Sequence, residues 1–382
     1  MSSRTSVSAA AFSIGLGALL LLPLPASASV FETEDAIVHA EILARGLENP
    51  WALAFLPDGA AIVTERPGRM RILSGGRLSA PLSGVPRVAA SGQGGLLDIA
   101  IAPDFEQSNR VYFTFSEPSQ GGAGTAVARA TLVRDGDGGR LENVEAIFSM
   151  SIKSSARQHF GSRLAFHPDG TLFVTTGDRG KADRAQDMND HAGAVLRINP
   201  YGTIPADNPS PDGSAHLPEI WSKGHRNIQG AVYDPITGAL WTTEHGARGG
   251  DELNRPQAGL NYGWPVISYG RHYTGGRIGI GTRAEGYEQP VMYWDPSIAP
   301  SGLAVYEGDM FPAWRGDFLS GALAYQLVAR IKRDDAGAVI GEERMFERQF
   351  GRIRDVRVAP DGSVWLVTDE ANGAVIRLSA GG

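Results

Sequence analysis

Residues 164–178 read LAFHPDGTLFVTTGD, in which two apolar segments flank a Pro-Asp-Gly turn and the second segment ends in threonines and an acid. The same pattern stands at 51–65 as WALAFLPDGAAIVTE and at 356–369 as VRVAPDGSVWLVTD. Apolar residues alternate with others along both segments, which is the period of two of a half-buried β-strand. Because Pro-Asp-Gly favours a tight turn, each copy predicts a β-hairpin.

The pattern recurs in looser form along the rest of the chain. Residues 97–116 keep Pro-Asp without the glycine, residues 231–244 invert it to Asp-Pro, and residues 303–319 are a degenerate copy. Six hairpins repeated every 45 to 75 residues or so, with no long amphipathic helix between them, predict an all-β, six-bladed β-propeller of four-stranded antiparallel blades. A pair of packed sheets in a β-sandwich is the alternative.

The N-terminal segment Ala36–Ala44 is also strand-like. We expect it to pair with the blade of the last repeat, which would close the ring without a free edge. Residues 29–382 would then form a single propeller domain. Equivalent loops of every blade meet on one rim of a propeller, so we expect a site on one rim at the central channel.

The start of the chain carries an export signal. Arg4 precedes an apolar run from Ala9 to Leu22, and Ala26-Ser27-Ala28 follows as a cleavage site. The run of about 14 residues is shorter than the roughly 20 that a membrane-spanning helix needs. We therefore predict that residues 1–28 are a cleaved signal peptide, that the protein is exported to the periplasm of a bacterium, and that it has no stable membrane insertion.

Composition and missing motifs exclude several function classes. The chain has no cysteine, which excludes disulfides, Cys-ligated metal sites and a cysteine nucleophile. Its formal net charge is −7, without a long Lys/Arg run, so nucleic acid is not an expected partner. The fingerprints of dinucleotide-binding enzymes, P-loop proteins, zinc proteases and serine hydrolases are absent.

Two polar loops precede strands of the repeats. His159 lies directly before the strand predicted at 164–166, where a neutral imidazole could serve as a general base or as a structural group. Arg226 and Asn227 precede the hairpin at 231–244 and could bind an oxyanion or polarise a carbonyl. A hydrogen-bonded turn is the alternative for this second pair.

Two further segments suggest binding sites, one for a cation and one for an anion. Residues 243–254 combine glycines with Asp251 and Glu252, and free carbonyls with carboxylates suit a hard cation such as Ca²⁺. Arg352 and Arg354 face the same side of a strand, which is unfavourable unless an anion or carboxylates lie between them. A small polycarboxylate would satisfy both guanidiniums, and a solvated edge with nearby acids is the alternative.

Six short motifs stand in order along the chain: residues 92–97 GQGGLL, 159–164 HFGSRL, 224–230 GHRNIQG, 261–265 NYGWP, 299–301 APS and 352–355 RIRD. Together they resemble the soluble PQQ-dependent sugar dehydrogenases, the glucose/sorbosone and aldose sugar dehydrogenase family, which are six-bladed propellers. The resemblance implies a PQQ- and Ca²⁺-dependent oxidation of the C1 hydroxyl of aldoses to the lactone by hydride transfer to PQQ. It leaves the electron acceptor undetermined.

The resemblance also implies roles for individual residues. His159 would be the catalytic base, and Arg226 would stabilise negative charge on the quinone oxygens of the cofactor. The resemblance places Gln93, Asn227, Arg352 and Arg354 on the cofactor, and Gln93 and Asp183 near the sugar. It implies that Gly246 and Ala247 are backbone ligands of the Ca²⁺ at PQQ. A second, structural Ca²⁺ would be held by Asp251, Glu252 and Tyr262.

Four positions depart from the family's glucose enzyme. Gln158 replaces an acid, Asp183 a glutamine, Ala247 a proline and Ala324 a lysine that holds the cofactor. The sugar-side changes imply an aldose substrate, not glucose specifically, and the missing lysine implies a weaker hold on PQQ. A calcium-dependent propeller lactonase or hydrolase and a non-enzymatic binding propeller are the alternative functions.

Overall fold

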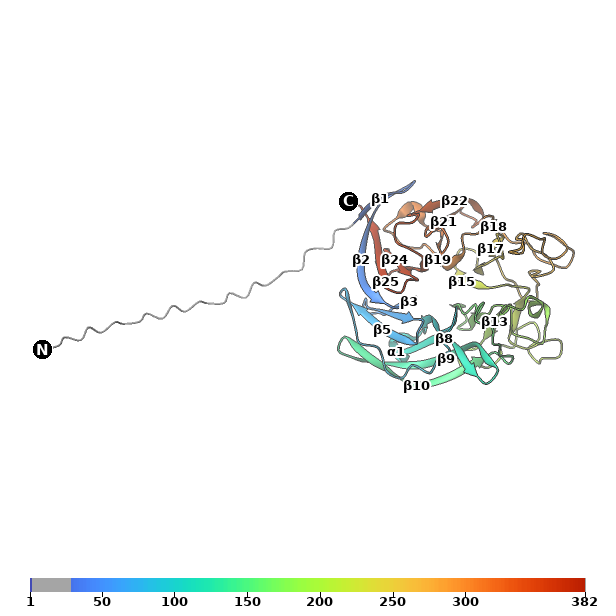
Figure 1. The fold of residues 1–382 in the computed structure, drawn as a ribbon, viewed down its shortest axis with the longest axis horizontal. Helices are drawn as coiled ribbons and strands as arrows, with labels where there is room; N and C mark the ends of the chain where they lie inside the picture. The colour runs from blue at the N-terminus through green and yellow to red at the C-terminus, as the bar shows by residue number, and fades with distance from the viewer. Residues whose placement is uncertain (2–28, 382) are drawn as a thin grey trace.

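The computed structural model describes residue 1 and residues 29–381, so the signal peptide predicted at 1–28 lies, apart from Met1, outside the described residues. The described chain forms six antiparallel sheets arranged in a ring (Figure 1), which confirms the predicted six-bladed propeller. The β-sandwich alternative is wrong. None of the helices in residues 29–381 is long and apolar enough to cross a membrane.

Each predicted hairpin forms the first two strands of one blade. These pairs are β3 (Pro50–Phe55) with β4 (Ala61–Glu65), β7 (Leu96–Ile101) with β8 (Arg110–Ser119), β11 (Leu164–Phe166) with β12 (Leu172–Thr175), β15 (Ile228–Asp234) with β16 (Ala239–Glu244), β19 (Pro300–Val305) with β20 (Phe318–Ala322), and β23 (Ile353–Val358) with β24 (Val364–Thr368). They begin blades one to six in that order.

Outer strands complete the blades. They are β5 (Arg69–Ser74), β6 (Arg77–Leu78), β9 (Gly122–Asp135), β10 (Gly138–Ser149), β13 (Ala194–Ile198), β14 (Ile220–Lys223), β17 (Asp251–Asn254), β18 (Met292–Trp294), β21 (Val328–Arg333), β22 (Val339–Met345) and β25 (Gly373–Ala380). The helical elements are α1 (Phe105–Ser108) and the 3₁₀ turns Ala182–Gln186 and Pro312–Trp314.

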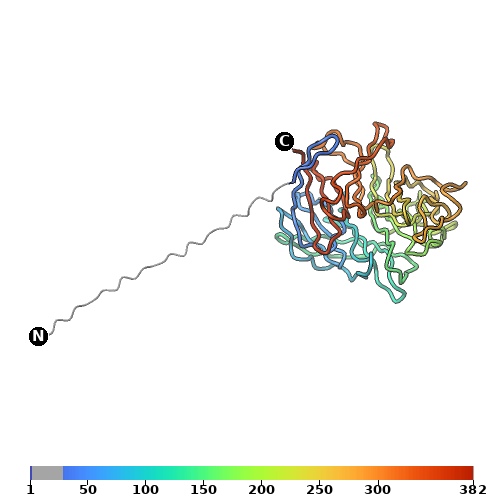
Figure 2. Tube along the Cα trace, turned by 45° about the horizontal axis from the view of Figure 1, so that its top comes forward, coloured from blue at the N-terminus to red at the C-terminus, as the bar shows by residue number. Residues whose placement is uncertain are grey.

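The two ends of the described chain close the ring. β2 (Ile37–Leu47) pairs with β25, so the first and last segments of the propeller lie side by side in Figures 1 and 2. This confirms the pairing expected of residues 36–44. Blade six differs from the prediction in one respect, because β1 (Ser29–Glu32) adds a fifth strand to it.

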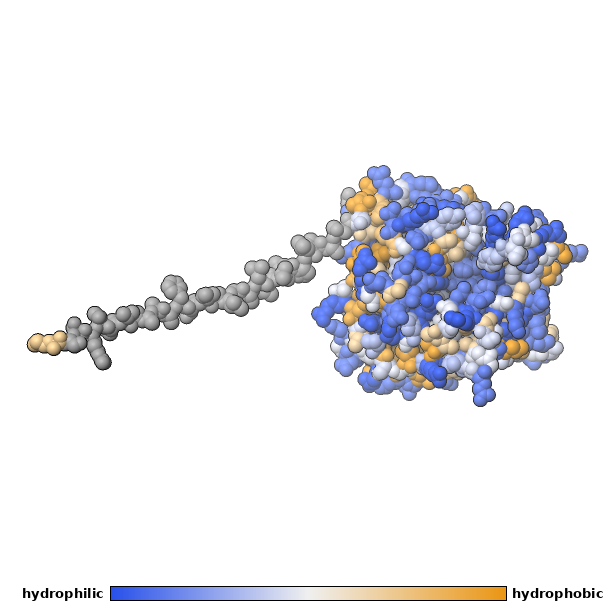
Figure 3. Space-filling view, viewed as in Figure 1, coloured by the Kyte–Doolittle hydropathy of each residue, from blue (hydrophilic) through white to orange (hydrophobic). Residues whose placement is uncertain are grey.

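Apolar side chains fill the spaces between neighbouring blades. One buried cluster joins Trp51 and Ile62 of blade one to Leu97 and Phe113 of blade two. The face shown in Figure 3 is mostly hydrophilic, with apolar residues in small groups. Packing between blades therefore holds the six inner strands around a common axis, and the loops at their ends share one rim.

Candidate active site

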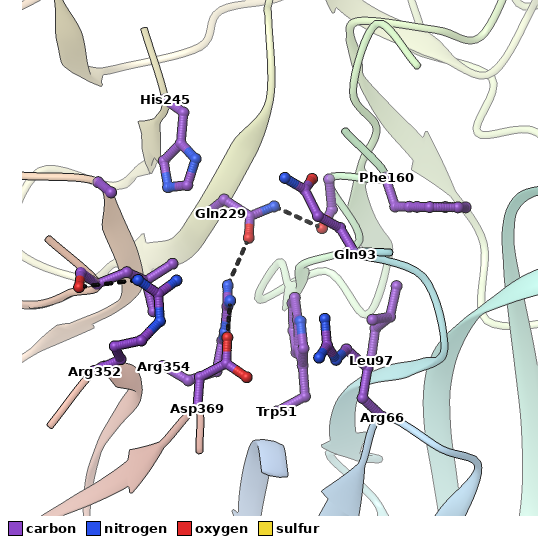
Figure 4. A pocket seen from close by; sticks show the side chains of 13 residues that line it. Trp51, Arg66, Gln93, Leu97, Phe160, Gln229, His245, Arg352, Arg354 and Asp369 are labelled. Carbon is purple, nitrogen blue, oxygen red and sulfur yellow. Dashed lines mark hydrogen bonds and ion pairs between the residues drawn. The ribbon is translucent and has the colours of Figure 1, made fainter. Parts of the chain in front are cut away.

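One cavity on this rim is built from all six blades (Figure 4). We call it the arginine cavity; its volume is about 170 Å³, and Trp51, Arg66, Gln93, Leu97, Phe160, Gly161, Gln229, His245, Ala299, Leu323, Arg352, Arg354 and Asp369 line it. The two arginines expected to share a strand face, Arg352 and Arg354, both lie in it. The cavity combines an indole ring and aliphatic side chains with several positive charges.

The charges of the arginine cavity do not balance. Arg354 forms an ion pair with Asp369 and donates a hydrogen bond of 2.9 Å to the Gln229 side chain (Figure 4). Among residues 29–381, the guanidiniums of Arg352 and Arg66 have no carboxylate partner and donate only to backbone carbonyls. Three guanidiniums thus share one carboxylate, an arrangement that favours a bound anion.

The pKa of Asp369 reflects this excess of positive charge. Burial raises the pKa of its carboxyl, but the charge of Arg354 beside it prevails and lowers the pKa to about 2. Asp369 is therefore ionised at neutral pH and can neutralise only one of the arginines. The buried Nε of Arg354 has no hydrogen-bond partner among the described residues, which leaves a donor free for a ligand.

A second cavity joins the two residues predicted to be catalytic. We call it the histidine cavity; its volume is about 220 Å³, and its lining includes Gln158, His159, Asp178, Ala182, Arg226, Ala247, Trp264, His272, Tyr273 and Ile278. It adjoins the arginine cavity, since Gln93 of that cavity accepts a hydrogen bond of 2.7 Å from the backbone N–H of His159. Asp183 is exposed beside Ala182 and does not line either cavity.

Asp178 holds the imidazole of His159. The distance from His159 Nδ1 to Asp178 Oδ1 is 2.6 Å, and Asp178 also accepts hydrogen bonds from Trp264 Nε1 at 2.9 Å and Gly180 N–H at 2.7 Å. Burial raises the pKa of Asp178, but these bonds, above all that with His159, keep it below its usual value. An ionised Asp178 fixes the proton of His159 on Nδ1 and leaves Nε2 free to act as a base.

The backbone around His159 is tightly folded. His159 itself has a φ of +54°, in the left-handed region that non-glycine residues rarely occupy. Gly161 has a φ of +63°, and a Cβ there would lie 2.6 Å from backbone atoms of Thr176. Only glycine fits at 161, and its turn carries His159 to the rim, directly beside β12 and Asp178. Strain of this kind recurs at functional sites.

Arg226 and Asn227 are buried beside the histidine. Arg226 donates hydrogen bonds to the backbone carbonyls of His245 and Gly246, and its Nε has no partner among the described residues. Asn227 Oδ1 accepts a bond of 3.2 Å from the Gly161 N–H, while its buried Nδ2 has none there. Both side chains therefore retain a donor that a ligand could satisfy.

His245 lines the arginine cavity and is uncharged. Its Nε2 donates a hydrogen bond of 2.8 Å to the Pro300 carbonyl. Burial lowers its pKa to about 3, with a contribution from the charges of Arg354 and Arg226. The site is already positive, so a charged imidazole here would be unfavourable.

Beneath Arg226 lies a third, small cavity, which we call the carboxylate cavity. It has a volume of about 10 Å³, and Glu244, Gly246, Glu252 and Tyr262 contribute to its lining. The Asn254 side-chain amide donates to both Glu244 and Glu252, at 2.9 and 3.0 Å. Burial and the charge of Glu244 raise the pKa of Glu252. Within residues 29–381 neither glutamate has an Arg or Lys in ion-pair contact.

The other residues expected at a metal are engaged in hydrogen bonds. Asp251 accepts from Gly246 N–H, Ser297 Oγ and Ala299 N–H, so its carboxylate braces the loop. The Tyr262 hydroxyl donates to the Arg255 carbonyl at 2.6 Å. No group of three or more His, Asp and Glu side chains in the described part of the chain is arranged to hold a metal ion.

Comparison with known proteins decides the family. The family model for glucose/sorbosone dehydrogenases matches residues 47–377, which is most of the propeller. The chain belongs to the glucose/sorbosone dehydrogenase family. It is therefore a sugar dehydrogenase, an oxidoreductase, as the sequence motifs suggested.

Individual relatives cover nearly the whole chain. The aldose sugar dehydrogenase YliI of Escherichia coli is 43% identical over 364 residues, which make up 94% of this chain and 97% of the relative. A crystal structure of the soluble aldose sugar dehydrogenase of Escherichia coli in the apo form has a TM-score of 0.86 at 43% identity, covering 90% of this chain and 100% of that chain. The PQQ-bound aldose sugar dehydrogenase of Streptomyces coelicolor has a TM-score of 0.74 at 30% identity, covering 93% and 99%.

The sequence alone assigns no individual role to several residues of this sugar dehydrogenase site. They are Trp51, Arg66, Asp178, Gln229, His245, Trp264 and Asp369. Two of them carry a signal in the sequence, because Asp178 and Asp369 are the acids that end the second segment of their repeats. Glu244 ends its repeat in the same way and pairs with His225 Nδ1 at 2.9 Å. With Glu65, which ends the repeat at 51–65, this repeat position carries an acid in four blades.

Proposed function

We propose that this sugar dehydrogenase is PQQ-dependent and oxidises the C1 hydroxyl of an aldose to the lactone. The observation that carries the proposal is the arginine cavity, in which Arg66, Arg352 and Arg354 share only Asp369. PQQ is a flat aromatic tricarboxylate, and a cavity with Trp51, Leu97 and an excess of guanidiniums matches its shape and charge. The PQQ-bound relative from Streptomyces coelicolor supports it.

The donors left unsatisfied in the protein fit such a cofactor. Arg354 Nε, Arg226 Nε and Asn227 Nδ2 are buried without partners among the described residues. Arg352, Arg354 and Arg66 would hold the carboxylates, and Arg226 and Asn227 would lie at the quinone oxygens. The chemistry that PQQ supplies when bound is acceptance of a hydride from C1 of the sugar.

The protein's own groups would handle the proton and the developing charge. His159 Nε2 would take the proton of the C1 hydroxyl, while Asp178 positions the ring and stabilises the imidazolium that results. Arg226 would stabilise negative charge that develops beside it. Gln93, which fixes the His159 backbone, and Asp183, which is exposed next to the histidine cavity, are the proposed contacts to the sugar.

We also propose that the enzyme requires Ca²⁺. The buried glutamates of the carboxylate cavity lack an Arg or Lys partner in the described residues, so a divalent cation there would relieve their repulsion, with backbone carbonyls such as that of Tyr262 completing the site. At Gly246 and Ala247 a second cation would need ligand oxygens from PQQ, because the Gly246 carbonyl already accepts from Arg226. Export to the periplasm through residues 1–28 remains part of the proposal.

The test is a titration of metal-stripped protein with PQQ, with and without Ca²⁺, followed by an aldose assay with an artificial acceptor. We expect saturable activation that requires Ca²⁺. In His159→Asn, PQQ should still bind while turnover falls at least ~100-fold, as expected when a general base is lost. Absence of PQQ binding at micromolar concentration would contradict the proposal, and metal-dependent lactone hydrolysis without PQQ would favour the lactonase alternative.

A further inference from the structure

The segment between β17 and β18 is basic although the protein as a whole is acidic. Residues 255–291 contain four arginines and one histidine against two acids, Glu285 and Glu288, in a chain of net charge −7. In Figure 1 this segment forms the loops at the right-hand edge of the ring, opposite β2. The overall composition of the chain, which is acidic, does not account for this local excess of positive charge.

Three arginines of this region lie on adjacent backbone segments. The backbones of Arg248 and Arg271 pair through two hydrogen bonds of 2.9 and 3.0 Å. The backbone of Arg271 also forms an isolated antiparallel β-bridge with that of Arg277. All three side chains are exposed. No carboxylate of the described chain lies within ion-pair distance of them, whereas most arginines elsewhere have such a partner. Like charges placed side by side without acids are unfavourable unless something negative covers them.

This basic surface borders the histidine cavity. Ala247, next to Arg248, and His272 and Tyr273, next to Arg271, line that cavity together with His159. Large apolar side chains are exposed in the same loop: Tyr273 retains 73% of its accessible surface and Ile280 retains 61%. Arginine with exposed aromatic and aliphatic side chains is typical of protein–protein contact surfaces.

We propose that Arg248, Arg271, Arg277, Tyr273 and Ile280 form the docking surface for an acidic redox protein that reoxidises the enzyme. An acidic protein fits better than a charged sugar, because these arginines are exposed and lie outside the cavity lining. The overall negative charge of the enzyme repels an acidic partner from other faces, which directs it to this one.

The inference rests on the proposed function, which requires an electron acceptor. Oxidation of one aldose to its lactone releases two electrons and two protons. Two molecules of a one-electron carrier protein are therefore reduced in turn, and the protons pass to solvent. Docking at the mouth of the histidine cavity brings the carrier to the edge of the oxidising site.

The test compares the full-length chain with Arg271→Glu/Arg277→Glu. Two probes are used, an acidic soluble b-type cytochrome and the basic mitochondrial cytochrome c. At low ionic strength we expect the double variant to lower the second-order rate constant of reduction of the acidic cytochrome at least ~10-fold, and added salt to remove most of the difference. The charge-preserving Arg271→Lys/Arg277→Lys should retain most of the rate.

Two controls separate the outcomes. Arg45→Glu makes the same substitution at a single exposed arginine of β2, across the ring, and should leave the rate within about twofold. Binding of the acidic cytochrome to the PQQ-free protein, measured by calorimetry, tests the surface even if PQQ dependence fails. The inference is overturned if the acidic cytochrome reacts no faster than the basic one, if the double variant reacts like the wild type, or if that variant instead lowers kcat/KM for glucuronate relative to glucose.

Discussion

Two arginine clusters meet on β23 and differ in their charge balance. The channel cluster consists of Arg163, Arg357, Asp98 and Asp355, in which two guanidiniums face two carboxylates at 2.8 to 3.3 Å. In the arginine cavity, by contrast, three guanidiniums share Asp369. Neighbouring positions of one strand, Arg354 and Asp355, contribute to opposite kinds of site.

The difference distinguishes charged side chains that are paired within the protein from those that are available to bind a ligand. Arg163 is fully buried, and burial lowers its pKa, but Asp355 and Asp98 oppose that effect. It also donates to the backbone carbonyls of Gln229 and Arg354, at 2.6 and 2.9 Å, and so ties three other blades together. A charge that is satisfied within the protein stabilises the fold, whereas an unsatisfied one is available to a ligand.

Breaking the channel cluster should have the largest effect on stability. Arg163→Met leaves Asp98 and Asp355 with only Arg357 and removes two hydrogen bonds to carbonyls, so we expect a loss of about 3–5 kcal/mol in the free energy of unfolding. Urea denaturation of the PQQ-free protein measures it. A loss below about 1 kcal/mol would show that the balanced cluster is not structural.

Breaking the arginine cavity should weaken cofactor binding instead. Arg352→Ala removes a guanidinium that has no carboxylate partner, so the free energy of unfolding should change by less than about 1 kcal/mol. Affinity for PQQ, followed by fluorescence titration, should fall about 10- to 100-fold, because a charge-assisted bond is lost. Arg45→Ala, at an exposed arginine of β2, is the matched control. A stability loss equal to that of Arg163→Met would remove the distinction between the clusters.

The pH dependence of stability tests the one carboxylate of the arginine cavity. Because the folded pKa of Asp369 is about 2, below its ordinary value of 3.8, its stabilising contribution is present above pH 4 or so and is lost as the pH falls towards 2. The contribution is about 2 kcal/mol. Asp369→Asn should therefore lose less stability than the wild type between pH 5 and pH 2 in urea titrations. If the free energy of unfolding of the two proteins falls equally between pH 5 and pH 2, the assigned contribution of Asp369 is contradicted.

The smallest effect is expected from adding a charge to the cavity. Ala324 stands next to Leu323, which lines the arginine cavity, at the position where the sequence resemblance implies a lysine in the family's glucose enzyme. Ala324→Lys should tighten PQQ binding about 2- to 5-fold, as expected of a partly solvated ion pair. Ala324→Met, which adds a similar stem without the charge, should not. Equal affinities of the two variants would show that Arg66 already makes the lysine redundant.

Much of the fold could be predicted from local sequence. Alternation of apolar residues, with the Pro-Asp-Gly turn in three repeats and looser forms in the others, predicted all six hairpins. The strand-like segment before the first repeat predicted ring closure through β2 and β25. The same two-residue period placed Arg352 and Arg354 on one face. These features depend on backbone geometry within a few residues, so a short stretch of sequence is enough to read them.

Only the tertiary structure decided which charges are balanced. Arg66 reaches Arg352 and Arg354 from the other end of the chain, and Asp369 pairs with Arg354 while Asp355 pairs with Arg163. The pairing of His159 with Asp178 likewise depends on a strained loop that lies against β12. Net charge around a cavity is a sum over six blades, and those blades become neighbours only when the ring closes.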